Sequence, residues 1–407
     1  MKLNLTIQPR FRIGLFPLVL ATLAGIAFVI ALWRYTFGIG AISNLSNAYP
    51  WGFWVSFDLF TGIAISSGAF ILASIVYIFE LEEFRPLLRP TLLTGLLGYV
   101  MEGIALLVEL GQPQRIWYFL RYQNFTSFLL FIGLYVMIYI AVLAVEFSPA
   151  VFERLKWDKA ASLVKGWMKP VVIFGAVIST LHQASLGSLL LIQPAKLHPL
   201  WWTPWIPPLF FISAIAIGLA MTIFESSLSS RYFQRGLETH LLEKLARAIP
   251  YVLGLYFVMK FAQLALEGKL GLLFTSGGMS VLFWAEILLG AVLPSILFSI
   301  KKIRQSASGL LTGAVVTLLG MILNRFNVSW FAVQHPDPLF YMPTFMSNVK
   351  YFPTLPEVAV SIGIFSAGIL AFGLAAKYLP VFEAERETEE THHSVRGLKP
   401  VPTSADD

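Results

Sequence analysis

Ten apolar stretches, most of about 20 residues, fill almost the whole of this 407-residue chain. A helix that crosses the hydrocarbon core of a bilayer needs about 20 apolar residues. Hydrophobic residues make up 57% of the sequence and charged residues only 13%, whereas a soluble domain carries about 25% charged residues. We therefore expect an all-α integral membrane protein with about ten transmembrane helices, at Ile13–Trp33, Phe53–Phe79, Pro90–Leu110, Thr126–Glu146, Pro170–Ile192, Trp205–Phe224, Ala248–Leu266, Met279–Ile300, Leu310–Leu323 and Pro356–Lys377.

The lysines and arginines predict the orientation of these helices. One set of alternate segments, which includes both chain ends, holds 21 of them, and the opposite loops hold 7. Cytoplasmic loops carry the excess of basic residues, so both termini of this multi-pass protein are expected in the cytoplasm. The basic residues form no single patch, which argues against a nucleic-acid partner. Residues 1–380 are expected to form one polytopic domain, and residues 381–407 a disordered polar cytoplasmic tail.

The sequence contains no cysteine. Disulfides, thiolate-held zinc, iron–sulfur clusters and covalent haem attachment are therefore excluded for this chain. A membrane b-type haem is commonly held by two histidines, and His182 is the only histidine inside a predicted span. We expect no haem, iron–sulfur cluster or metal bound by this chain, so that any redox metal belongs to a partner.

Several ionisable side chains lie inside the predicted spans, where each costs roughly 2.5–3.5 kcal/mol on insertion scales. Asp58 lies one to two turns below the outer end of the second span, and His182 lies near the middle of the fifth. Glu102 and Glu109 are seven residues apart on one face of the third span, with Tyr99 just inward of Glu102. Such costly groups usually mark a site or a pathway, although each glutamate could instead pair with a nearby base.

A lipid-soluble quinone takes up protons on both ring oxygens when it is reduced. Carboxyl and imidazole groups beside an apolar slot suit that chemistry, and aromatic side chains can stack on the ring. Further buried charged groups are Glu225, Lys260 and Glu286, in the sixth, seventh and eighth spans. The pattern therefore favours quinone chemistry coupled to proton transfer.

Several short motifs resemble the NrfD family of membrane subunits, and most closely its HybB branch, which belongs to uptake nickel–iron hydrogenases. The resemblance runs from about Trp33 to Lys377. The motifs are Tyr49-Pro50-Trp51-Gly52-Phe53-Trp54 followed by Asp58, the stretch from Glu109 to Trp117, His182-Gln183-Ala184-Ser185-Leu186-Gly187, and Phe283-Trp284-Ala285-Glu286.

The resemblance implies a haem-free subunit of the bacterial inner membrane that binds menaquinone or ubiquinone near the periplasmic face. It would exchange electrons with a periplasmic iron–sulfur subunit, itself joined to the catalytic subunits of a hydrogenase, a multihaem cytochrome or a molybdenum enzyme. The middle eight helices would form two four-helix bundles. The implied residues are Asp58, His182, Trp51, Tyr99 and Ser185 for the quinone, Glu102, Glu109, Glu225, Lys260 and Glu286 for proton transfer, and Arg115, Trp117, Arg121 and Arg325 for partner docking.

Two other functions stay open at this point. Buried acids also occur in proton-coupled transporters and ion pathways, although those usually show broken helices in matched halves. A passive membrane anchor for a redox complex would tolerate neutral replacement of the buried acids.

Overall fold

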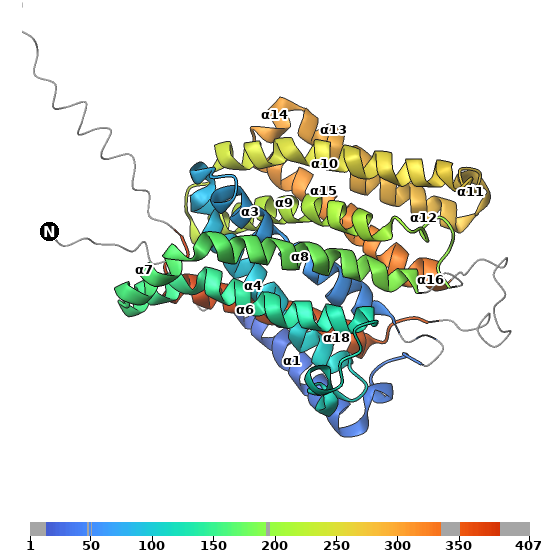
Figure 1. The fold of residues 1–407 in the computed structure, drawn as a ribbon, viewed down its shortest axis with the longest axis horizontal. Coiled ribbons are helices and arrows are strands. Elements are labelled where there is room, and N and C mark those ends of the chain that lie inside the picture. Colours follow the sequence, from blue (N-terminus) through green and yellow to red (C-terminus); the bar gives the residue numbers. More distant parts are fainter. Residues whose placement is uncertain (1–13, 47–48, 50, 193–195, 335–350, 383–407) are drawn as a thin grey trace, which may run out of the picture.

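The computed structural model describes residues 14–46, 49, 51–192, 196–334 and 351–382, and within them it contains helices and no strands (Figure 1). Ten of these helices are long and apolar enough to cross a membrane, which confirms the predicted number of spans. The predicted tail from residue 383 onward lies outside the described residues. Both described chain ends lie on the same side of the spans, which we call the terminal face; the other side is the opposite face.

Seven of the spans are single α-helices, and the second, eighth and ninth include a π-helical segment. The spans are α1 (Leu15–Phe37), η2–α2–α3 (Val55–Gly62, Ile63–Ser66, Gly68–Tyr77), α4 (Arg85–Glu109), α6 (Phe128–Leu155), α8 (Met168–Leu191), α9 (Ile206–Phe233), α10 (Thr239–Leu266), α12–η5–α13 (Gly278–Ile287, Leu288–Val292, Leu293–Ser299), α15–η6 (Ala307–Phe326, Asn327–Phe331) and α18 (Leu355–Tyr378). Short helices lie between them: η1 (Ile39–Ala41), η3 (Glu82–Phe84), η4 (Pro113–Arg115), α5 (Tyr118–Arg121), α7 (Asp158–Gly166), α11 (Leu272–Thr275), α14 (Lys301–Arg304) and α16 (Ala332–Gln334).

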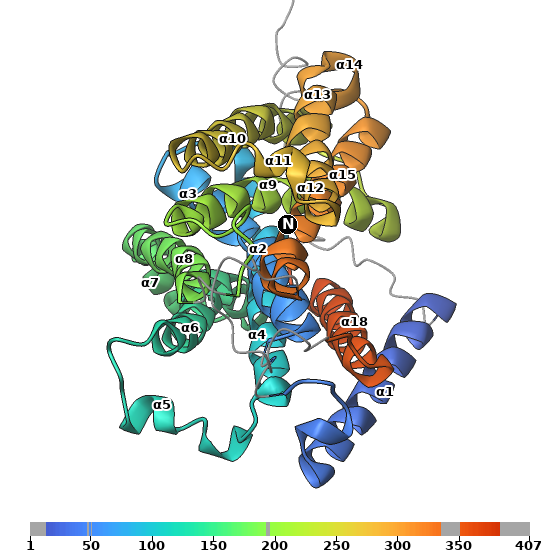
Figure 2. The same cartoon turned by 90° about the vertical axis from the view of Figure 1, so that its right-hand side faces the viewer.

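The eight middle spans form two four-helix bundles, as predicted. In the first bundle, α3, α4, α6 and α8 pack in a ring, each against the next. In the second, α9, α10, α13 and α15 do the same. In Figure 2, α4, α6 and α8 lie below α9, and α10, α13 and α15 lie above or beside it.

Small residues let the two bundles approach closely where α3 meets α9. A Cβ atom built on Gly68 would lie 2.9 Å from the carbonyl oxygen of Gly218. The Ser67 hydroxyl beside it donates to the carbonyl oxygen of Ala214, at 2.7 Å. Close backbone approach of this kind is how membrane helices gain packing energy, since lipid is as apolar as their side chains.

Two ion pairs lie at the terminal face. Lys244 at the start of α10 pairs with Glu83, which lies just before α4. Lys169 pairs with Glu80 at 2.6 Å, and this hydrogen bond holds the pKa of the Glu80 carboxyl below its usual value. Both pairs are exposed, so each adds little to stability.

The helices α1 and α18 form a separate pair beside the bundles (Figure 2). Gly363 of α18 lies directly against Ala27 of α1. At the opposite face, the guanidinium of Arg34 on α1 is only 3% exposed and donates to the carbonyl oxygens of Val108, at 2.6 Å, and of Leu110. Those carbonyls end α4 and have no partner within that helix, so Arg34 satisfies them and fixes α1 to the first bundle.

The ninth span differs from its prediction. The sequence predicts Leu310–Leu323, but the span continues to Phe331 through the π-helix η6. Asn324, Arg325 and Asn327 interrupt the apolar run, yet all three are buried inside the second bundle. The predicted end was wrong because hydropathy counts a polar residue as exposed even when the protein supplies its partners.

The close contact between α15 and η5 gives a stability prediction. A Cβ on Gly320 would collide with the backbone of Gly290, whereas one on Gly254 of α10 would meet nothing within 4 Å. Alanine favours a helix over glycine by about 1 kcal/mol, and overpacking costs about 1–3 kcal/mol. We expect Gly320→Ala to lower the unfolding temperature of the purified protein and Gly254→Ala to keep or raise it. Equal unfolding temperatures for the two variants would contradict this packing.

Candidate functional site

A cavity of about 560 Å³ lies between the α1–α18 pair and the two bundles. Its walls are apolar side chains of five spans, and three carboxyl groups interrupt them: Asp58, Glu102 and Glu225. The structure therefore brings together one sequence-predicted quinone residue and two sequence-predicted proton-transfer residues. They lie in three different spans, and only the tertiary fold makes them neighbours of one space.

Asp58 lies toward the opposite face, in the π-helix Val55–Gly62. Its Oδ2 accepts a hydrogen bond from Ser361 of α18, at 2.7 Å. π-Helical turns inside membrane or soluble helices frequently occur at functional sites. The segment also turns Gly62 toward α4, because a Cβ there would lie 3.2 Å from Oε2 of Glu102. Asp58 and Glu102 thus lie about one helical turn apart along the same wall.

The Glu102 and Glu225 carboxyl groups lack full sets of partners. Glu102 is 3% exposed, and its Oε1 accepts no hydrogen bond from the described residues. Both carboxyl oxygens of Glu225 are likewise without a hydrogen-bond donor there. Glu225 lies eight residues before the end of α9, or about 12 Å from the terminal face. Unpartnered buried polar atoms call for water or a ligand.

His182 lies inside the first bundle, fully buried. Its Nδ1 is 3.2 Å from the Tyr99 hydroxyl, and its Nε2 has no partner among the described residues. His182 and Tyr99 are not among the described residues that line the cavity. Tyr99 precedes Glu102 by three residues on α4, so the two side chains are neighbours on that helix. The Tyr99 side chain therefore lies between His182 and the face of α4 that bears Glu102.

The other predicted residues in this half of the protein are Ser185, Trp51 and Glu109. Ser185 follows His182 by three residues on α8 and is half-buried. Trp51 is half-buried next to the start of the second span and packs on the main core. Glu109 is the last residue of α4, at the opposite face.

A second polar cluster fills the core of the second bundle around Glu286, which is 1% exposed. Its Oε2 accepts from Trp201 Nε1 at 2.7 Å and from Asn327 at 2.9 Å. Its Oε1 accepts from Asn324 at 2.6 Å and from Tyr256 at 3.2 Å. Sequence reasoning found Glu286 but missed these four donors. Asparagines inside an apolar run were the available signal.

Arg325 belongs to the same cluster and corrects a prediction. We expected it in an outward loop, but it is 1% exposed within α15. Its guanidinium donates to Asn324 at 2.7 Å and to Ser213 at 2.8 Å, and lies 3.9 Å from the ring centre of Phe210. It therefore offers no surface for a partner. Lys260 is also buried in this bundle, with its Nζ 5.6 Å from the ring centre of Phe283.

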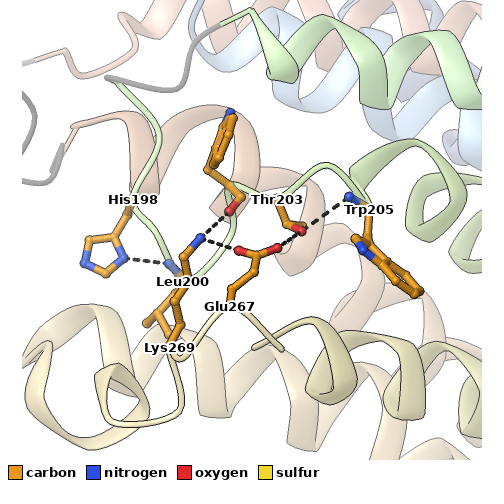
Figure 3. Close-up of polar contacts among 7 residues, drawn as sticks. His198, Leu200, Thr203, Trp205, Glu267 and Lys269 are labelled. Carbon is orange, nitrogen blue, oxygen red and sulfur yellow. Dashed lines mark hydrogen bonds and ion pairs between the residues drawn. The ribbon is translucent and has the colours of Figure 1, made fainter. Parts of the chain in front are cut away.

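Polar contacts also fix the loops of the second bundle at the opposite face (Figure 3). Glu267 accepts from Thr203 at 2.6 Å and pairs with Lys269 at 2.5 Å, and Lys269 also donates to the carbonyl oxygen of Trp202 at 3.0 Å. Two loops far apart in the sequence are thus held as one surface. The predicted docking residues Arg115, Trp117 and Arg121 lie exposed on the same face, before and within α5, which stands away from the bundles in Figure 2.

Ten apolar spans, two helical bundles and a buried, carboxyl-lined cavity define a class of polytopic membrane proteins with polar chemistry inside the bilayer. The sequence model of the polysulphide reductase NrfD family matches residues 41–334. The chain therefore belongs to this family, as its motifs predicted, and is a multi-pass bacterial membrane protein.

Three curated relatives match this chain over most of their own length. The probable Ni/Fe-hydrogenase 2 b-type cytochrome subunit of Escherichia coli is 32% identical over 92% of this chain and 94% of its own. The integral membrane subunit of the menaquinone reductase of Nitratidesulfovibrio vulgaris is 27% identical over 86% and 87%. Protein NrfD of Escherichia coli is 26% identical over 68% and 93%.

The buried position of Arg325 predicts a structural effect. Removing one member of a buried, hydrogen-bonded charge cluster costs about 3–5 kcal/mol. We expect Arg325→Ala to lower the unfolding temperature of the purified protein strongly, whereas Arg121→Ala on the exposed helix α5 leaves it unchanged. If Arg325→Ala keeps its normal stability but binds partner subunits more weakly, the buried position is wrong and Arg325 is a docking residue.

Proposed function

We propose that this protein is the haem-free, quinone-reactive membrane subunit of a respiratory redox complex, most closely related to hydrogenase complexes. The observation that carries the proposal is the apolar cavity with Asp58, Glu102 and Glu225 spaced along it. Its volume of about 560 Å³ falls in the range of small-molecule sites, about 300–1,000 Å³. Menaquinone or ubiquinone fits its chemistry, and one relative is named as part of a menaquinone reductase.

Bound quinone supplies two-electron chemistry that takes up or releases two protons. We assign Asp58 to the ring oxygen at the closed end of the cavity: Ser361 occupies its Oδ2, which leaves Oδ1 to hold or move a proton. Glu102 lies next along the wall and passes protons to Asp58. Carboxyl groups placed this way contribute about 10²–10⁴-fold to a proton-transfer step.

Two routes lead to Glu102 in this proposal. Glu225 carries protons into the cavity from the terminal face, which the basic residues assign to the cytoplasm. The His182–Tyr99 pair serves as a second donor, since Tyr99 joins His182 to the face of α4 that bears Glu102. Glu109 extends the row at the opposite face, and Trp51 and Ser185 remain predicted quinone contacts.

Lys260 and Glu286 remain predicted proton-transfer residues, in a separate cluster of the second bundle. Glu286 already accepts four hydrogen bonds. A carboxylate with its acceptor sites occupied is held in place, so we place the main proton route in the cavity and not in this cluster.

The described histidines do not fit a bis-histidine haem site. His182 is fully buried, with Tyr99 at its Nδ1. His198 lies in a loop at the opposite face, where its Nδ1 accepts from the backbone N–H of Leu200 (Figure 3), and His240 lies in the first turn of α10 at the terminal face. We therefore assign the redox metals to partners, a periplasmic iron–sulfur subunit and the catalytic subunits of a hydrogenase or a related enzyme.

The cavity acids give the main functional prediction. In the intact complex, Asp58→Asn is expected to slow electron transfer between hydrogen and quinone by about 10²-fold or more, because the ring oxygen loses its proton donor. Asp158→Asn, on the surface helix α7, is the matched control and should keep the normal rate. A normal rate in an assembled Asp58→Asn complex would contradict the role of Asp58 and favour the passive-anchor function.

The exposed basic residues at the opposite face give a docking prediction. Charge reversal at Arg115 and Arg121 is expected to reduce co-purification of the extrinsic subunits, and more strongly at low salt, where exposed charges are least screened. Lys159→Glu, on α7 at the terminal face, should leave co-purification unchanged. If only the Lys159→Glu variant loses the partner subunits, the docking surface lies at the terminal face and the prediction is wrong.

A further inference from the structure

The two ends of the cavity differ in exposure. Near Asp58, the wall residues Ser361, Thr61 and Ala105 are 1%, 2% and 5% exposed, so these side chains close this end. Along the middle of α18, Phe365 and Ile369 are 48% and 39% exposed, so the wall is partly open there as well. At the other end, Phe16 is 54% exposed and Tyr232 is 43% exposed. The cavity therefore begins inside the protein near the opposite face and reaches the lipid-facing surface near the terminal face.

The attachment of α1 explains this asymmetry. Arg34 fixes the last turns of α1 to the end of α4. The first turn of α1 meets α9 through one ring contact, with the Phe16 and Tyr232 centroids 5.9 Å apart. The opening thus lies between the first turns of α1 and the last turns of α9, at the level of the inner leaflet given the predicted orientation.

The cavity is long as well as apolar. Along α18 its wall runs from Ser361 to Gly373, twelve residues apart, which corresponds to about 18 Å of helix. Its closed end bears the Asp58 carboxyl group, and its middle is walled by side chains such as Leu97, Met101 and Phe365. A molecule with a small polar ring and a long hydrocarbon chain matches a cavity that is polar at one end and apolar along its length.

We propose that this opening is the lateral entrance for the quinone and the resting place of its isoprenoid tail. This inference rests on the proposed function, because it assumes that the polar ring occupies the Asp58 end. The tail then lies against Leu20 of α1 and Leu228 of α9 and leaves the protein beside Phe16 and Tyr232, toward the leaflet on the terminal face. A phospholipid acyl chain with its phosphate at Arg231, which also lines this end, is the competing occupant.

Photo-crosslinking tests the position of the tail. The intact complex in lipid nanodiscs is illuminated with a quinone analogue that carries a diazirine at the end of an isoprenoid tail, and the labelled peptides are identified by mass spectrometry. We expect label in residues 15–20 and 228–233, and we expect unlabelled long-tailed quinone to compete it away. Label confined to helix ends at the opposite face would overturn the proposal. Label at the terminal face would also overturn the proposal if excess phospholipid displaces it and excess quinone does not.

A pair of variants narrows the entrance selectively. Leu20 lines the cavity and is 8% exposed, whereas Leu18 on another face of α1 is 60% exposed. Leu20→Trp is expected to lower crosslinking, and kcat/KM for long-tailed quinone, by roughly tenfold, with little effect on a tail-less quinone. Leu18→Trp is the matched control and should change neither. Equal effects of Leu20→Trp on both quinones would show that the tail does not pass Leu20, and the proposed entrance would be wrong.

The outcomes separate this inference from the function on which it rests. If Asp58→Asn abolishes reduction of the tail-less quinone while Leu20→Trp changes neither crosslinking nor tail selectivity, the function stands and the entrance is wrong. If Asp58→Asn leaves reduction of the tail-less quinone intact, the proposed function is wrong, and the inference that rests on it is wrong as well.

Discussion

The hydrocarbon core provides no water to hydrogen-bond a polar group, so each such group depends on partners from the protein. Arg34, Glu286 and Arg325 all receive them. Arg34 donates to the end of α4, and Glu286 and Arg325 join a network that spans the second bundle. These contacts hold α1 against the first bundle and α15 in the core of the second, so the arrangement of the spans depends on them.

A second set of buried polar groups lacks such partners. Oε1 of Glu102, both carboxyl oxygens of Glu225 and Nε2 of His182 have none among the described residues. Stability alone does not explain them, because each unpaired group carries a desolvation cost of about 1–3 kcal/mol or more. Glu102 and Glu225 line the cavity, and His182 lies behind Tyr99. Unpartnered atoms also occur away from the cavity, for example on Gln263, so the missing partners single out these residues only together with their place at the cavity.

Hydropathy and charge predicted the span count and the buried acids, because they are properties of single segments, whereas the two bundles were predicted from the resemblance to the NrfD family. It could not predict that Asp58 and Glu225 share a cavity while His182 lies outside it, since that depends on which faces of the spans meet. Arg325 was misplaced for a related reason: the sequence does not reveal that Ser213 and Asn324 satisfy its guanidinium. The π-helix around Asp58 left no sequence signal that we could identify.

The match to the family covers residues 41–334, which are the two bundles, while α1 and α18 lie outside it. These two flanking helices provide one whole side of the cavity. The part matched by the family model thus bears the three carboxyl groups, while the flanking pair closes the space beside them. If the cavity binds a quinone as proposed, changes in these two peripheral helices can alter selectivity for chain length and leave the three carboxyl groups in place.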